Sequence, residues 1–269
     1  MRILKTIKLV RPTFSTDSAL HLSAPRSWAE LTQDQLRYVL TLLNTFGSSV
    51  DTKVYLLCRF NGIRVHRRDK YGWKCSVRTA WWKVRRYFTI KTWQVLDLIS
   101  QFDFIDSFES MNTRLVSING YHAVDVRLHG VRFFDYLQAE KYYQIWQYQK
   151  DDAWIAKLAC YLYVDYDGHH PSHMTLSQDE TLSVIMWYSF VKFEMSKAFR
   201  HFFKKVDGDE VGEYNMMAAM NAQIRALTDG DITRESTIYD CDCWRALTEL
   251  DAKAREANEY KKMMKKNGK

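Results

Sequence analysis

Proline and glycine, the residues that interrupt regular structure most strongly, are scarce in this sequence. The chain holds 3 prolines and 10 glycines in 269 residues, which favours long regular elements over a loop-rich fold. No run reaches the roughly 18 apolar residues that a membrane-spanning helix needs, so we expect no membrane partner. The five cysteines are scattered and odd in number, and the first residues do not read as a secretory signal. We therefore expect free thiols and an intracellular, cytoplasmic location.

Sequence motifs for catalysis are also missing. The chain has no glycine-rich phosphate loop, no Gly-x-Ser-x-Gly nucleophile elbow and no His-Glu-x-x-His zinc motif. Its neighbouring acids, such as Asp151 with Asp152, lie at expected helix starts or turns, where capping accounts for them. We therefore expect no enzyme activity and no cofactor.

Apolar and aromatic side chains, by contrast, are plentiful. Hydrophobic residues make up 46% of the sequence and aromatic residues 14%, which is enough to bury a substantial core. Alternating stretches such as Arg2–Val10 predict short strands in the first half, and helical periodicity dominates after Gly130. We expect a mainly helical α+β fold. Residues 1–130 form a small mixed α+β part in this prediction, and residues 131–269 form a helical part that ends in a frayed, lysine-rich tail.

The clearest expected helix is Ser27–Phe46. Ser27 followed three residues later by Glu30 is typical of a capping box, and Gly47 suits the helix end. Its apolar residues recur at helical spacing, at Leu36, Val39, Leu40 and Leu43. The apolar side of this helix therefore belongs in a core.

Positive charge is concentrated in the segment Arg59–Lys91. The whole chain has a net charge of +7, and this segment alone holds eleven lysines and arginines against one acid, Asp69. Its basic residues alternate with valine and aromatic residues, which favours short strands or a hairpin. The following segment, Asp97–Phe190, is acidic, with thirteen acids against six basic residues.

The basic aromatic segment is the candidate binding surface. Lysine and arginine can contact phosphates while tryptophan or tyrosine stacks on bases, the combination that a single-strand binder needs. An acidic protein partner, or a solvated cationic face of a sheet, explains the same pattern. The candidate residues for binding a protein partner or nucleic acid are Arg67, Arg68, Trp73, Lys74, Arg78, Trp81, Lys83, Arg85 and Arg86.

Histidines cluster in the segment Asp165–His173. Its three histidines, His169, His170 and His173, and its two aspartates are residue types that bind zinc and similar ions. Pro171 prevents the segment from placing ligands at i and i+4 of one helix, and no second cluster supplies the remaining ligands. We therefore interpret the segment as a solvated loop and predict no bound metal.

Two stretches near the ends of the chain carry a resemblance to a known group. The first is a strand followed by a helix start with the residues Pro25, Ser27, Trp28, Glu30, Leu31, Thr32, Gln35 and Leu36. The second is Ala226–Glu235, followed by Trp244–Leu250. Both resemble accessory proteins of tailed phages and prophages, especially those of Bacteroides-type hosts. Their layout is similar to that of tail assembly chaperones, which bind the tape measure protein.

The resemblance implies a non-catalytic phage or prophage assembly factor in the bacterial cytoplasm. Its implied partner is a phage structural protein such as a tape measure protein. We expect an aromatic groove to hold hydrophobic helices of that partner, with the basic segment steering acidic stretches towards it. The alternative is a nucleic-acid-binding protein that uses the basic aromatic segment, residues 59–91.

Overall fold

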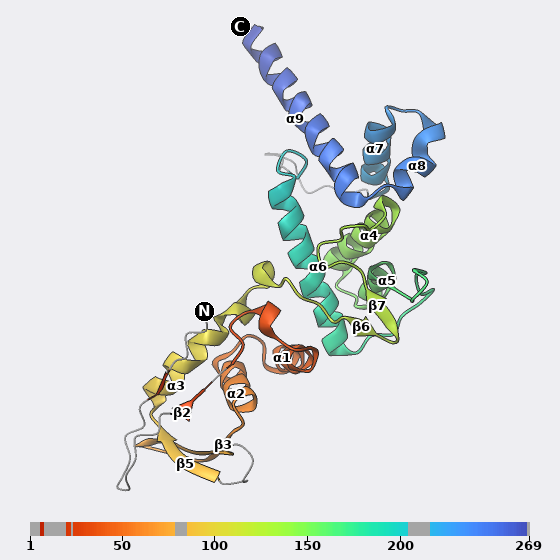
Figure 1. Cartoon of the computed structure of the whole chain (residues 1–269). Helices are drawn as coiled ribbons and strands as arrows, with labels where there is room; N and C mark the ends of the chain where they lie inside the picture. The colour runs from red at the N-terminus through yellow and green to blue at the C-terminus, as the bar shows by residue number, and fades with distance from the viewer. Residues whose placement is uncertain (1–5, 8–19, 23, 79–84, 204–215, 268–269) are drawn as a thin grey trace. The chain divides into compact units, whose positions relative to one another are not determined.

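The computed structural model describes residues 6–7, 20–22, 24–78, 85–203 and 216–267. It divides into two compact units, Met1–Ser110 and Met111–Lys269 (Figure 1). Each unit contains its own helices and its own three-stranded antiparallel sheet. The sequence-based expectation of an α+β fold that is mainly α is confirmed.

The first unit combines a sheet with helices that precede and follow it. Its sheet contains β3 (Ile63–Asp69), β4 (Gly72–Arg78) and β5 (Arg85–Ile90), in that order. Its α-helices are α1 (Gln33–Phe46), α2 (Val50–Phe60) and α3 (Thr92–Ile99). Shorter elements are the paired strands β1 (Thr6–Ile7) and β2 (Leu20–His21) and the 3-10 helices η1 (Trp28–Glu30), η2 (Ser100–Asp106) and η3 (Phe108–Ser110).

The helix expected to begin at Ser27 begins at Gln33 instead. A 3-10 turn, η1, occupies the expected first turn, and Ser27 makes no side-chain capping hydrogen bond. The cap is Thr32, whose hydroxyl accepts a hydrogen bond from the Gln35 amide at 3.2 Å while the Gln35 side chain accepts one from the Thr32 amide at 2.9 Å. The prediction of the start was wrong because Thr32 and Gln35 form the same kind of capping box closer to the apolar stripe.

The buried side chains of the β3–β4–β5 sheet share one face. Ile63, Cys75, Val77 and Ile90 are all less than a tenth exposed. Helix α2 contacts β3, and α2 and α3 lie on the same side of the sheet (Figure 1). Burial raises the pKa of the Cys75 thiol to about 11, and the proximity of Cys58 on α2 adds to the shift. Helix α2 therefore covers this face.

The second unit is a helical assembly with a small sheet at its start. Its strands are β6 (Ser117–Ile118), β7 (Tyr121–Ala123) and β8 (Tyr163–Val164). Its helices are α4 (Phe133–Gln149), α5 (Ala153–Leu162), α6 (Gln178–Ala198), α7 (Met216–Thr228), η4 (Ile232–Arg234), α8 (Glu235–Asp240) and α9 (Cys243–Asn267).

Aromatic residues of α4 and α6 form much of the second unit's core. Tyr143 of α4 and Tyr188 of α6 are buried, and their ring centroids lie 5.0 Å apart. The Tyr188 hydroxyl donates to Glu140 at 3.1 Å, and Lys192 pairs with the same carboxylate at 2.7 Å. Buried aromatic residues of this helix pair are therefore used for internal packing.

The boundary between the units lies at Ser110, earlier than the expected boundary near Gly130. The reason is the pairing of β7 with β8, which follows α5 in the chain. This pairing ties β6 and β7 to the second unit, although the sequence before Gly130 has the strand-like character of the first. Among the helices described, none is both long enough and apolar enough to cross a membrane.

Candidate functional site

The pairing of β4 with its two neighbours decides which side chains share a face. Directly paired residues point to the same side of a sheet, and successive residues of a strand point to opposite sides. Lys74 pairs with Arg67 and Thr89, Ser76 with Arg64 and Tyr87, and Arg78 with Arg85. These side chains therefore lie on the face opposite Cys75 and Val77, away from α2.

We call this surface the basic face. It consists of Arg64, His66, Arg67, Lys74, Ser76, Arg78, Arg85, Tyr87 and Thr89. Its five lysine and arginine side chains are all exposed. Lys74 lies 3.4 Å from Asp69. Within the described part of the chain, no carboxylate comes within ion-pair distance of the four arginines of this face.

Two pairs of cations stand directly opposite each other on the basic face. Arg78 pairs with Arg85 across β4 and β5, and Lys74 pairs with Arg67 across β4 and β3. Like charges directly opposite on neighbouring strands destabilise a sheet. A bound polyanion would remove this repulsion, because it places negative charge between the paired cations.

The structure brings together only part of the predicted binding set. Arg67, Lys74, Arg78 and Arg85 lie on the basic face. Arg68, Trp73 and Arg86 lie on the opposite face, where the Arg68 guanidinium is 5.2 Å from the Trp73 ring centroid. Trp81 and Lys83 fall outside the described residues. The predicted residues therefore divide between two surfaces.

The basic face also contains residues that sequence reasoning missed: Arg64, His66 and Tyr87. A register shift between Val65 and Arg67 leaves His66 unpaired in the ladder, and His66 Nε2 lies 2.7 Å from Ser76 Oγ. Tyr87 and Phe88 are adjacent, so in a strand one of the two must face away from the core. That adjacency was an available signal for Tyr87, whereas the register shift has no clear signature in the sequence.

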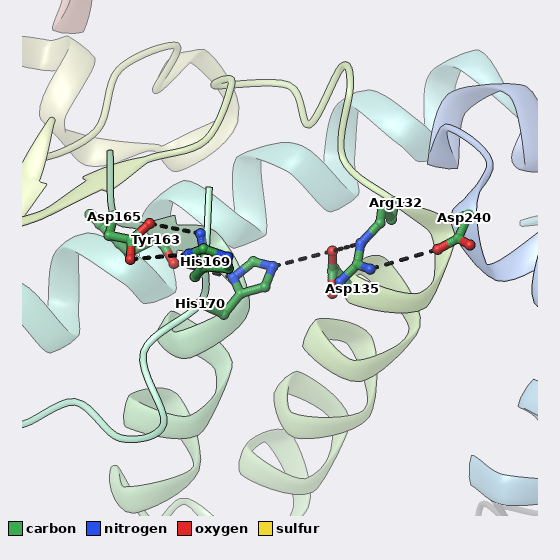
Figure 2. Close-up of polar contacts among 7 residues, drawn as sticks. All are labelled: Arg132, Asp135, Tyr163, Asp165, His169, His170 and Asp240. Carbon is green, nitrogen blue, oxygen red and sulfur yellow. Dashed lines mark hydrogen bonds and ion pairs between the residues drawn. The ribbon is translucent and has the colours of Figure 1, made fainter. Parts of the chain in front are cut away.

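The predicted histidine segment lies beside a pocket of the second unit. The pocket has a volume of about 730 Å³, and its polar lining includes Asp125, His129, Arg132, Asp135, His169 and His170. Figure 2 shows the His170 ring directed at Asp135, with Arg132 between Asp135 and Asp240. The loop after β8 and the first turn of α4 both line this pocket.

Buried Asp135 is held by two cations. Arg132 donates to both of its carboxylate oxygens, at 2.9 Å and 3.1 Å, and His170 Nε2 lies 3.2 Å from Oδ2. His170 Nδ1 donates to the Tyr163 carbonyl at 3.2 Å. Both ring nitrogens therefore have acceptors, which is the pattern of a charged imidazolium.

The two titrating groups of this cluster shift in opposite directions. The hydrogen bond to Asp135 raises the pKa of His170 above its usual 6.5, against the lowering effect of burial. Burial alone would raise the pKa of Asp135, but the hydrogen bonds from His170 and Arg132 lower it below its usual 3.8. Since neither nitrogen of His170 is free to accept a proton, this arrangement favours a structural ion-pair cluster over a general base.

The three histidines considered as metal ligands do not converge. His170 is held by Asp135 and Tyr163, and His173 Nδ1 lies 3.3 Å from the Ser172 hydroxyl. His169 approaches Asp165 at 3.5 Å. Asp165, Asp167 and His169 have side-chain ligand atoms within 4.8 Å of one another, but the Asp165 carboxylate already accepts from the backbone amides of the other two. Hydrogen bonds within the turn therefore account for the placement of these polar groups.

Comparison of the chain with models of protein families, with curated proteins and with solved structures found no match. The tape measure partner and the role in phage tail assembly therefore stay predictions from the resemblance of the two chain ends. The interface whose geometry points most directly to a class of ligand is the basic face.

Proposed function

We propose that this protein binds nucleic acid through the basic face of its β3–β4–β5 sheet. The observation that supports this most is the pair Arg78 and Arg85. They stand opposite each other on an exposed surface, with no carboxylate at ion-pair distance among the described residues. A sheet that keeps a repulsive pair at its surface, where neutral residues would suit folding better, is suited to bind an anion.

A polyphosphate chain fits this surface better than an acidic protein segment. The cores of protein–protein interfaces are depleted of charged residues overall and centre on large aromatic and apolar anchors, although arginine is enriched among them. Here charged and polar side chains occupy both ends of the face, and its two rings, His66 and Tyr87, occupy the middle. That combination of backbone-neutralising cations and rings is what nucleic-acid-binding surfaces use.

Binding through the basic face should weaken steeply as the salt concentration rises. If all five cations of the basic face contact phosphates, the logarithm of the binding constant falls with the logarithm of salt concentration with a slope of about −3.5 to −4.5. Fluorescence anisotropy with a labelled oligonucleotide, measured between about 0.05 M and 0.3 M salt, gives this slope directly.

The decisive comparison uses two double variants that remove the same net charge. Arg78→Gln with Arg85→Gln neutralises the basic face, and Arg245→Gln with Arg255→Gln neutralises two exposed residues of α9. The first should weaken binding on the order of 30-fold at about 0.1 M salt and flatten the slope by about 1.4 to 1.8. The second should change neither by more than about twofold. Equal losses in both variants would show that net charge, and not this face, governs binding.

A further inference from the structure

The basic face has two rings at its centre. His66 of β3 and Tyr87 of β5 have ring centroids 5.6 Å apart with an interplanar angle of 37°. Between them on β4 lies Ser76, whose hydroxyl contacts the His66 ring nitrogen at 2.7 Å. Because serine is small, the rings of the two outer strands approach each other above the middle strand.

The ring of Tyr87 is open to solvent. Tyr87 is 70% exposed, although it lies within β5 and pairs with Ser76 of the central strand. His66, its neighbour, is exposed as well. The exposed Tyr87 ring therefore offers a face on which a planar, apolar group can stack, with the tilted His66 ring beside it.

Cations flank the ring pair along the strand direction. The row of Arg78 and Arg85 lies two residues along β4 from Ser76, and the row of Lys74 and Arg67 lies two residues the other way. Two residues of a strand span about 6.6 Å. A chain crossing the rings can therefore place a base on them and phosphates on the cations at either side.

A double helix uses this surface poorly. Its bases are stacked on one another inside the duplex, so they cannot stack on a protein ring unless they are unpaired. Its major groove, about 12 Å wide, admits an α-helix or a two-stranded ribbon. The outer strands of this sheet are separated by about 10 Å before their outward side chains are counted, so the whole face is too broad to lie in the groove.

We infer that the ligand of the basic face is single-stranded nucleic acid, with an unpaired base stacked on the exposed Tyr87 ring beside His66. This rests on the proposed function and narrows it to one class of ligand. The sugar is not distinguished by stacking, so single-stranded DNA and single-stranded RNA share the chemistry that the rings recognise.

The experiment compares the full-length protein on four equal-length probes: a thymine-only DNA strand, a uracil-only RNA strand, a mixed-sequence DNA strand and its duplex. Binding to each is measured by fluorescence anisotropy at the same salt. We expect at least one single-stranded probe to bind at least tenfold more tightly than the duplex. The ratio of the affinities for the thymine-only DNA and the uracil-only RNA then shows whether the protein prefers single-stranded DNA or single-stranded RNA.

Three tyrosine variants test the ring itself. Tyr87→Ala should weaken single-strand binding by about 5- to 150-fold, the range for loss of one base stack, while leaving the salt slope unchanged because no charge is removed. Tyr87→Phe keeps the ring and should bind within about twofold of wild type. Tyr71→Ala is the matched control, since Tyr71 is 69% exposed but lies between β3 and β4, outside the basic face.

The possible failures are distinguishable. Duplex binding as tight as single-strand binding, or full affinity in Tyr87→Ala, would overturn the single-strand inference and leave the proposed function standing. A parallel loss in Tyr87→Ala and Tyr87→Phe would also overturn it, because the hydroxyl and not the stack would then be responsible. Absence of binding to every probe at low salt would overturn the proposed function as well.

Discussion

Neutralising Arg78 should stabilise the first unit and weaken nucleic-acid binding at the same time. Arg78 and Arg85 are directly paired across β4 and β5, and both are exposed. Like charges opposite each other destabilise a sheet by roughly 0.2–1 kcal/mol, and solvent exposure and salt place this pair towards the lower end. Arg78→Gln keeps a long polar side chain and removes that repulsion, so we expect a gain of a few tenths of a kcal/mol.

The affinity should change in the other direction. For each phosphate contact, the logarithm of the binding constant rises by about 0.7 to 0.9 when the salt concentration falls tenfold. Relative to about 1 M salt, the loss of one contact at about 0.1 M is therefore about five- to eightfold. The gain in stability should be largest at low salt, because screening weakens the repulsion in the wild-type protein.

Urea unfolding followed by circular dichroism measures the stability, and oligonucleotide anisotropy on the same preparations measures the affinity. Arg245→Gln on α9 is the control, as it removes an equal charge from an exposed helix position. A variant that loses both stability and affinity would refute the reasoning, because a misfolded sheet would then explain the binding defect. So would an unchanged affinity, which would mean that Arg78 does not contact the ligand.

Further predictions concern the second unit, the sheet and the partner. Asp135→Asn should lower the stability of the second unit by about 2–3 kcal/mol, measured by hydrogen exchange at α4. This loss is below the usual cost of breaking a buried ion pair because the Arg132 side chain is half exposed. The control is Asp152→Asn, which removes an exposed acid with no capping hydrogen bond and should change the stability little. The pKa of His170 is raised above 6.5 by its hydrogen bond to Asp135, so the ion pair contributes fully below that pH and is lost as the pH rises through the folded-state pKa. Exchange at α4 should therefore speed up above about pH 6.5 beyond its intrinsic pH dependence, and this excess should vanish in Asp135→Asn. Gly72→Ala should disrupt the sheet and abolish binding, because φ at Gly72 is +133° and an added Cβ would meet a backbone carbonyl of β5, whereas Gly62→Ala, with open space around it, should cost only about 1–2 kcal/mol. If the protein is a tail assembly chaperone, co-expression should keep a tape measure protein soluble, and failure to co-purify with it would remove that hypothesis.

The sequence was sufficient for the fold class but not for all element boundaries. Apolar periodicity placed a helix ending at Phe46, and the structure has it there. The expected start was wrong because two candidate caps, Ser27 and Thr32, precede the same apolar stripe, and the box of Thr32 with Gln35 lies closer to it. The division of the structure after Ser110 also differs from the expected boundary near Gly130. The pairing of β7 with β8 is a long-range contact, and local composition near Gly130 carries no information about it.

The sequence located the candidate binding segment but did not determine which of its residues share a surface. Charge counting located the basic segment, because net charge is a property of composition. The division of its residues between two faces depends on strand ends and on the register shift at His66, and neither is set by the alternation of residue types alone. For this reason Arg68 and Trp73 were grouped with Arg78, although the fold places them on opposite sides of the sheet.

The two units use their charged residues in opposite ways, and this contrast is the strongest reason to place the function in the first. In the pocket of the second unit, Asp135 is matched by Arg132 and His170, and Arg132 reaches Asp240 as well. Such a cluster is satisfied without a ligand and ties together segments that are distant in sequence. On the basic face, by contrast, the repulsive pair Arg78 and Arg85 and an exposed ring pair remain. Among the described residues, Asp69 lies at ion-pair distance from Lys74 and also attracts Arg67, but no carboxylate lies at ion-pair distance from Arg78 or Arg85. Folding does not need that arrangement, but a bound strand of phosphates and bases would satisfy both of its features.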